Sequence, residues 1–123
     1  MDTLELYGNR YEEGEIEKKI LGTDIVYVGG GNTLRMMRMW RKHSVDLLLR
    51  KAWENGTVMA GLSAGSICWF EAGHSDSRKG ADPTKAFEYM KVRGLGLIEG
   101  LHCPHYDVEE YRRPELHKMI LKS

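Results

Sequence analysis

The residues best suited to chemistry form the motif Gly-Leu-Ser-Ala-Gly at 61–65. An apolar run at 57–60 precedes it and predicts a buried strand, and residues 66–70 predict the start of a helix. A serine between glycines on a strand–turn–helix is typical of a nucleophile elbow, in which a tight turn lifts the hydroxyl above the sheet edge. Ser63 is therefore the candidate nucleophile. The simpler alternative is a turn rich in small residues for packing.

A serine hydroxyl becomes a good nucleophile only beside a base that removes its proton. His102 and His105 follow an apolar segment at 95–98 that predicts a strand. Because open α/β sheets place their sites at the carboxyl ends of strands, these two histidines are the better candidates, with a structural role as the alternative. The remaining histidines lie in charged helical surroundings or in a polar stretch at 73–85 that predicts a loop: His43, His117 and His74.

An acid must orient the base and stabilise its charged form. Asp76 and Asp107 are the two options. The order Ser63, Asp76, His105 repeats the serine–aspartate–histidine order of other elbow hydrolases.

An oxyanion hole needs two hydrogen-bond donors beside the nucleophile. The Ala64 backbone N–H is one candidate. The glycine loop at 29–31 ends the neighbouring predicted strand, so the N–H group of Gly30 or Gly31 is the other.

Two rival interpretations are weaker. The glycine loop lacks the Gly-x-Gly-x-x-Gly spacing of a phosphate-binding loop and any following Gly-Lys-Ser/Thr. The run His-Cys-Pro-His at 102–105 contains metal-ligand types but has no second ligand pair at zinc-site spacing. We therefore expect neither a cofactor nor a metal.

The surrounding pattern predicts alternating helices and strands. Helices are expected at 12–21, at 34–41 and from a Ser44 cap through residue 55, and the tail at 108–123 is expected to be helical with Pro114 as an interruption or in the first turn. Strands are expected at 24–28, 57–60, 87–92 and 95–98. Strands separated by helices of this length indicate an α/β fold with a parallel sheet flanked by helices.

Composition limits the function further. The 123 residues allow one domain, spanning 1–123. The 18 basic and 18 acidic residues give a formal net charge of +0, so we expect no nucleic-acid partner and no membrane partner. Two cysteines and no secretory leader predict a reduced, cytoplasmic protein.

Four motifs in order carry a resemblance to a known family. They are Tyr-Val-Gly-Gly-Gly-Asn-Thr at 27–33, Gly-Leu-Ser-Ala-Gly-Ser at 61–66, Ser-Asp-Ser at 75–77 and Cys-Pro-His-Tyr at 103–106. Together they resemble the peptidase E (aspartyl dipeptidase) family of serine peptidases, over about residues 21–106. That family usually has alanine at the position of Ser66.

The resemblance implies roles for individual residues. Ser63 would be the nucleophile, His105 the base and Asp76 the third member, acting on small peptides and typically on dipeptides with an N-terminal aspartate. It also implies a fold similar to that of the class I glutamine amidotransferases, whose elbow carries cysteine. Family members place an arginine after the histidine, so Arg113 first and Arg112 second are expected to clamp the substrate carboxylate, unless both are simply solvated.

Length sets the last expectation. Relative to that family the chain is expected to be shortened at both ends, which leaves a sheet edge and helix faces uncovered and predicts a homo-oligomer. Two alternatives remain: an inactive member that serves as a binding or assembly module, and an α/β hydrolase acting on an amide other than a dipeptide.

Overall fold

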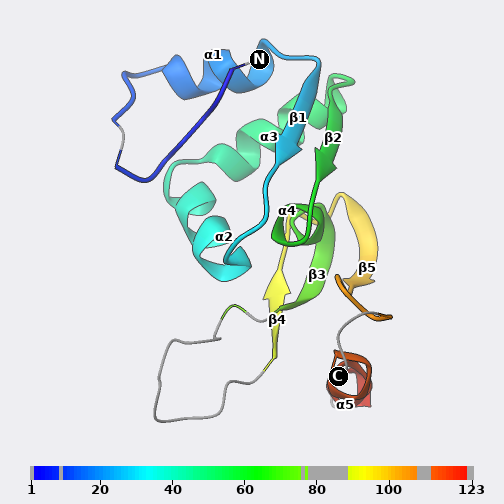
Figure 1. Cartoon of the computed structure of the whole chain (residues 1–123). Coiled ribbons are helices and arrows are strands. Elements are labelled where there is room, and N and C mark those ends of the chain that lie inside the picture. Colours follow the sequence, from blue (N-terminus) through cyan, green and yellow to red (C-terminus); the bar gives the residue numbers. More distant parts are fainter. Residues whose placement is uncertain (1, 9, 76, 78–88, 108–111, 122–123) are drawn as a thin grey trace.

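Helices and strands alternate through most of the chain in the computed structural model, which describes residues 2–8, 10–75, 77, 89–107 and 112–121 (Figure 1). The first half contains α1 (Glu15–Leu21), β1 (Ile25–Val28), α2 (Thr33–Lys42), α3 (Val45–Glu54) and β2 (Val58–Gly61). The second half contains α4 (Ala64–Ile67), β3 (Phe70–Ser75), β4 (Met90–Arg93), β5 (Ile98–His102) and α5 (Arg112–Leu121). None of these helices is long and apolar enough to cross a membrane.

The strands form two small sheets. β1 and β2 pair in parallel, with Ile25 opposite Val58 and Val28 opposite Gly61, so both strands end beside the elbow. In the second sheet β3 lies between β4 and β5, antiparallel to β4 and parallel to β5. The predicted α/β fold with parallel strands flanked by helices is confirmed, and β4 adds an antiparallel strand to it.

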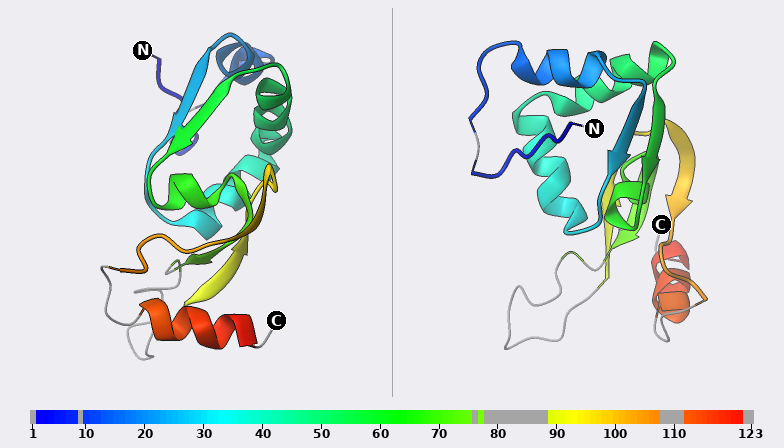
Figure 2. Two further views of the ribbon diagram at one scale, coloured as in Figure 1. Left: turned by 90° about the vertical axis from the view of Figure 1, so that its right-hand side faces the viewer. Right: turned by 45° about the horizontal axis from the view of Figure 1, so that its top comes forward.

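The helices α2 and α3 lie on one side of the β1–β2 pair (Figure 2). Val26, Val28 and Met59 turn toward the apolar core on that side. The buried members of this core come from α1, α2, α3, the segment after α4, and β4: Ile20, Met37, Trp40, Val45, Leu49, Ala52, Cys68, Trp69 and Val92. The alternate residues Ile25, Tyr27 and Val58 remain 63%, 65% and 59% exposed, so helices cover only one of the two apolar faces within the described residues.

The two central helices begin differently. At the start of α2 the Asn32 side chain accepts a hydrogen bond from the Arg35 N–H at 3.0 Å, as a capping residue does. Ser44 precedes α3 in a left-handed conformation, with φ at 58°, and its side chain makes no capping hydrogen bond. The prediction that Ser44 caps α3 through its hydroxyl is therefore wrong.

The helix after the elbow is shorter than its apolar pattern predicts, and a strand follows it at once. We expected a helix through residues 66–70 and a polar loop at 73–85, but α4 ends at Ile67 and β3 runs from Phe70 to Ser75. Gly73 explains the reversal, because a Cβ atom there would lie 2.2 Å from Cγ2 of Ile67. The strand therefore packs directly against the single turn of α4.

The later elements are shifted along the chain. The strand expected at 95–98 is observed at Ile98–His102, because the N–H groups of Leu95 and Gly96 donate to the carbonyls of Cys68 and Phe70 in a turn. The strand expected at 87–92 is observed at Met90–Arg93, and residues 87–88 lie outside the described part. In α5 Pro114 sits within the first turn, where its missing N–H costs nothing.

Candidate active site

Two glycines allow the elbow to form between β2 and α4. A Cβ atom at Gly65 would lie 2.0 Å from the Val28 carbonyl oxygen, and one at Gly61 would lie 1.9 Å from the Gly65 carbonyl oxygen. Any larger residue at either position would push α4 away from the strands. The turn leaves Ser63 with φ at 56° and ψ at −112°, outside the regions that serine ordinarily occupies.

Ser63 and His105 meet at hydrogen-bond distance. Ser63 Oγ lies 2.8 Å from His105 Nε2, although Ser63 follows β2 in one sheet and His105 follows β5 in the other. Both residues have positive φ, and Ser44 is the third such non-glycine residue among those described. Strained backbone of this kind is found preferentially at active sites, where surrounding contacts hold it in place. The pair has the geometry that a nucleophile and its base require.

The glycine loop lies directly beside Ser63. A Cβ atom at Gly30 would be 3.7 Å from the Ser63 Cβ and 3.6 Å from the Leu62 carbonyl oxygen. The Ala64 N–H belongs to the first turn of α4, where the helix itself supplies no acceptor. That this N–H and that of Gly30 or Gly31 converge on one oxyanion position stays a prediction.

Asp76, the first candidate for the orienting acid, lies outside the described residues. Its neighbour Ser77 is fixed to the N-terminal end of α2. Asn32 Nδ2 donates to the Ser77 carbonyl at 2.8 Å, and the Leu34 N–H donates to Ser77 Oγ at 3.1 Å. The other candidate acid, Asp107, pairs with Arg113 on the surface at 3.1 Å.

A second serine–histidine contact adjoins the first. His102 Nε2 lies 2.9 Å from Ser66 Oγ, and the same hydroxyl donates to the Ser63 carbonyl oxygen at 2.6 Å. We did not assign Ser66 from the sequence. The available signal was the matched spacing, because the two serines and the two histidines are each three residues apart. Burial and, secondarily, the neighbouring His105 lower the pKa of His102.

The two candidate arginines lie in different surroundings. Arg112 is buried, donates to the His74 carbonyl at 3.1 Å and stacks over the Tyr89 ring. His74, which we expected in a polar loop, is itself buried on β3. Arg113 is exposed and pairs with Asp107. Their role as a substrate clamp stays a prediction, but Arg112 is not the solvated side chain that the alternative required.

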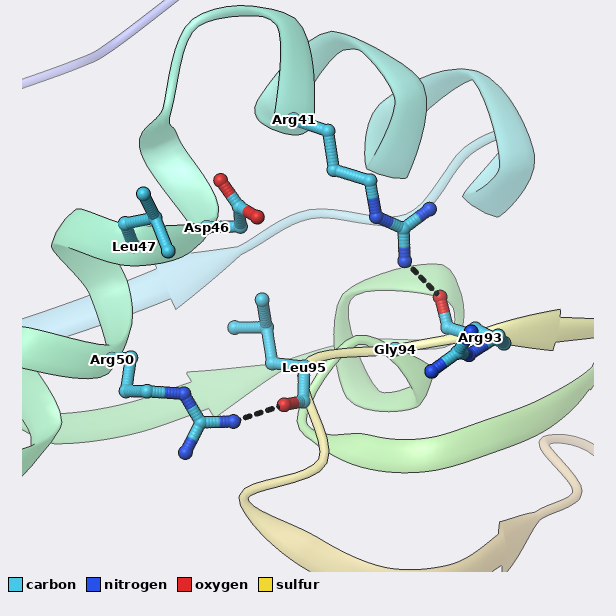
Figure 3. A pocket seen from close by; sticks show the side chains of 7 residues that line it. All are labelled: Arg41, Asp46, Leu47, Arg50, Arg93, Gly94 and Leu95. Carbon is cyan, nitrogen blue, oxygen red and sulfur yellow. Dashed lines mark hydrogen bonds between the residues drawn. The ribbon is translucent and has the colours of Figure 1, made fainter.

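Three arginines surround a separate hollow of about 440 Å³ between α2, α3 and the end of β4 (Figure 3). Arg41 donates to the Arg93 carbonyl at 3.0 Å, and Arg50 donates to the Leu95 carbonyl. Gly94, on the same wall, lies close to the carbonyl groups of Ile67, Cys68 and Phe70, at the opposite end of α4 from Ser63. Arg41 and Arg50 thereby hold the end of β4 and the turn after it in place.

The buried thiol of Cys68 is not suited to act as a nucleophile. Cys68 is buried, its Sγ lies 3.0 Å from the Gly65 carbonyl oxygen, and burial raises the pKa of its thiol. A buried thiol with a raised pKa is a poor nucleophile. Among the residues that the structure describes, no group of three or more histidine, cysteine, aspartate or glutamate side chains is placed to hold a metal ion.

The fold and this site define an α/β protein with a strained strand–turn–helix elbow that carries Ser63 beside His105. The chain belongs to peptidase family S51, whose sequence model matches residues 1–123. The family resemblance drawn from the four motifs is thereby confirmed.

Two curated relatives and one solved structure agree with this assignment. The chain is 46% identical over 101 residues to the uncharacterized peptidase YgaJ of Bacillus subtilis (strain 168), an alignment covering 82% of this chain and 40% of that protein. It is 29% identical over 100 residues to the uncharacterized peptidase Lmo0363 of Listeria monocytogenes, covering 76% of this chain and 45% of that protein. The chain thus spans less than half the length of both relatives.

The solved structure supports the fold. A crystal structure of a candidate peptidase E protein from Listeria monocytogenes EGD-e matches with a TM-score of 0.67 and 23% identity. The match covers 92% of this chain and 55% of that one.

Proposed function

We propose that this chain carries the active site of a serine peptidase of the peptidase E type, which hydrolyses small peptides and prefers dipeptides with an N-terminal aspartate. The observation that carries the proposal is the 2.8 Å contact between Ser63 Oγ and His105 Nε2 at a strained elbow. Membership of family S51 supports the peptidase activity. Both cysteines are free thiols, which supports a reduced, cytoplasmic setting.

In the proposed reaction Ser63 Oγ attacks the peptide carbonyl carbon while His105 Nε2 accepts the hydroxyl proton. The N–H groups of Ala64 and of Gly30 or Gly31 stabilise the oxyanion. His105 then gives the proton to the departing amine as the peptide bond breaks. Water next attacks the acyl carbonyl while His105 takes its proton, and His105 returns that proton to Ser63 Oγ as the ester bond breaks. Asp76 would orient His105 through Nδ1–H.

The first experiment tests the nucleophile. A fluorophosphonate probe should label the wild-type chain at Ser63, and Ser63→Ala should abolish both labelling and dipeptide hydrolysis. Ser63→Ala should change the free energy of unfolding by no more than about 1 kcal/mol, because a partly exposed hydroxyl contributes little to folding. Ser44→Ala is the matched control, since Ser44 is exposed and its side chain makes no capping bond.

A panel of dipeptides then tests the substrate class. Hydrolysis of aspartyl dipeptides, with neutral dipeptides cleaved much more slowly, would support the aspartate preference. Labelling of Ser63 with no dipeptide hydrolysis would favour another amide substrate. An unlabelled, folded wild-type chain would contradict the proposed function and favour a binding or assembly module.

A further inference from the structure

We propose that Ser66 and His102 form a second serine–histidine pair whose role is to position the first. In this arrangement the two residues hold the carbonyl group of Ser63 and thereby fix the strained backbone that presents its hydroxyl to His105. The proposal rests on the proposed function, in which Ser63 is the nucleophile. In the proposed reaction neither Ser66 nor His102 contacts the substrate, so both are positioning residues.

The Ser63 carbonyl oxygen accepts three hydrogen bonds. The N–H groups of Ser66 and Ile67 donate to it at 2.9 and 3.1 Å, as the start of a helix requires. The Ser66 hydroxyl adds a third at 2.6 Å by bonding back to the carbonyl three residues earlier, a bond that the helix backbone alone does not make. A backbone as strained as that of Ser63 costs about 1–3 kcal/mol and persists only where neighbouring contacts over-determine it. The third bond is such a contact.

The hydroxyl proton of Ser66 decides how His102 takes part. A hydroxyl has one proton, and a carbonyl oxygen can only accept, so that proton lies on the bond to the Ser63 carbonyl. The contact between Ser66 Oγ and His102 Nε2 must then be donated by the histidine. His102 therefore carries a proton on Nε2, whereas His105 must keep its Nε2 free to accept from Ser63. Nε2 of His102 must therefore donate a hydrogen bond, whereas Nε2 of His105 must accept one.

The pair also connects the elbow to the second sheet. His102 is the last residue of β5, and its ring stacks on Phe70 of β3 with centroids 4.6 Å apart and planes at 8°. The stack fixes the direction of Nε2. His105 follows three residues later in the chain. The contact from His102 to Ser66 therefore helps to keep the segment that contains His105 close to Ser63.

The main experiment is a double-mutant cycle read by the rate of fluorophosphonate labelling and by kcat and KM for the cleaved dipeptide. Ser66→Ala and His102→Ala should each lower the labelling rate and kcat about tenfold, the size of one net hydrogen bond, with KM little changed. The double variant should be no slower than the slower single variant, because His102 acts through Ser66. His102→Gln retains a donor and should recover most of the rate.

Controls separate positioning from folding. His43→Gln changes an exposed histidine at the C-terminal end of α2, the opposite end from the glycine loop, and should leave the rate unchanged. Each variant is checked by thermal unfolding, and if His102→Ala does not fold, the comparison rests on His102→Gln and Ser66→Ala. The proposal would be overturned if the losses in kcat add up in the double variant. It would also be overturned if the variants raise KM and leave kcat unchanged.

A readout independent of catalysis is the tautomer of His102, measured by NMR on chain labelled with ¹⁵N at histidine. We expect a protonated Nε2 above the pKa of His102, and loss of this preference in Ser66→Ala. A proton on Nδ1 in the wild type would overturn the proposal even if Ser63 is labelled. If Ser63 is not labelled, the proposed function fails, while the tautomer still decides whether the second pair exists.

Discussion

At the scale of single residues, the site brings together two conformations that are costly for non-glycine side chains. Ser63 and His105 both have positive φ, and the hydrogen bond between their side chains joins the two strained positions. Such strain is retained when it serves a function and is offset by the surrounding structure. The hydrogen bonds on the Ser63 carbonyl supply part of that offset here.

His102 predicts a pH dependence of stability. Burial holds its pKa in the folded chain below the ordinary value of 6.5, whereas the unfolded histidine takes up a proton near that value. Between the two pKa values the unfolded state binds more protons, so the free energy of unfolding falls as the pH drops from 6.5 through the lowered pKa. Urea unfolding at pH 7.5, 6 and 5 measures this.

The comparison is with His102→Gln, which cannot titrate and should lose less stability over the same interval. Carboxylates elsewhere contribute equally to both proteins and cancel in the difference. Parallel stability curves for the wild type and His102→Gln would show that His102 does not contribute to the slope.

The proposed preference for an N-terminal aspartate depends on Arg113. Its guanidinium is exposed and pairs with Asp107 through one contact, and a substrate carboxylate could take the place of Asp107 and bind in a bidentate way. Arg113→Ala should raise KM at least about tenfold for aspartyl dipeptides, the worth of a charge-assisted hydrogen bond, and leave neutral dipeptides unaffected. Steady-state kinetics on both substrate classes measure the difference.

The exposed Arg38 on α2 provides a matched control as Arg38→Ala. Normal hydrolysis of aspartyl dipeptides by Arg113→Ala would rule this clamp out. Arg112→Ala is the less direct test, because Arg112 is buried and donates to the His74 carbonyl, so its loss affects folding as well.

At the scale of elements, the elbow depends on how closely α4 approaches β1. Gly65→Ala would place its Cβ 2.0 Å from the Val28 carbonyl oxygen and should destabilise the fold by about 2 kcal/mol or more, since backbone must move to relieve the overlap. Gly29→Ala meets nothing within 4 Å and should cost less than about 0.5 kcal/mol. Denaturant midpoints of the two variants measure this contrast, and equal midpoints would contradict it.

Local patterns predicted the elements that precede the elbow. The strands at 24–28 and 57–60 and the helices before them are found within a few residues of their expected bounds, because apolar periodicity and glycine stops are read within one element. Placing Ser63 and the two histidines at 102 and 105 at the carboxyl ends of strands predicted that they lie close together, and the family resemblance singled out His105.

Contacts distant in sequence determined what the patterns missed. The apolar residues at 66–70 suit a helix, but packing of Gly73 on Ile67 starts β3 at Phe70 instead. The shift of β5 depends on hydrogen bonds from the turn after β4 to Cys68 and Phe70. Likewise, Ser66 gains its role only because β5 brings His102 against it.

At the scale of the whole molecule, one face of the β1–β2 pair is uncovered among the described residues. Ile25, Tyr27 and Val58 form an apolar patch there, opposite the side that α3 covers. We propose that two copies of the chain associate through this patch, because contiguous exposed apolar surface favours association and two-fold dimers are the commonest result.

Light scattering at micromolar concentration should return about twice the chain mass of 14.1 kDa. Tyr27→Lys should reduce the mass to that of one chain, because it places a charge within the contact. Leu47→Lys, at a residue also 65% exposed but on α3, should leave the dimer intact. A wild-type mass near 14 kDa with cooperative unfolding would contradict association.

The candidate site lies between the two sheets, and each sheet supplies one of its two residues. Ser63 is carried by the sheet of β1 and β2, and His105 by the sheet of β3, β4 and β5, with the one turn of α4 between them. The two sheets share one apolar core, since Val92 of β4 and Trp69 pack with α1, α2 and α3. A small displacement of one sheet against the other would lengthen the 2.8 Å contact while both strand ladders stay intact, so we expect the reactivity of Ser63 to respond to the relative position of the two sheets.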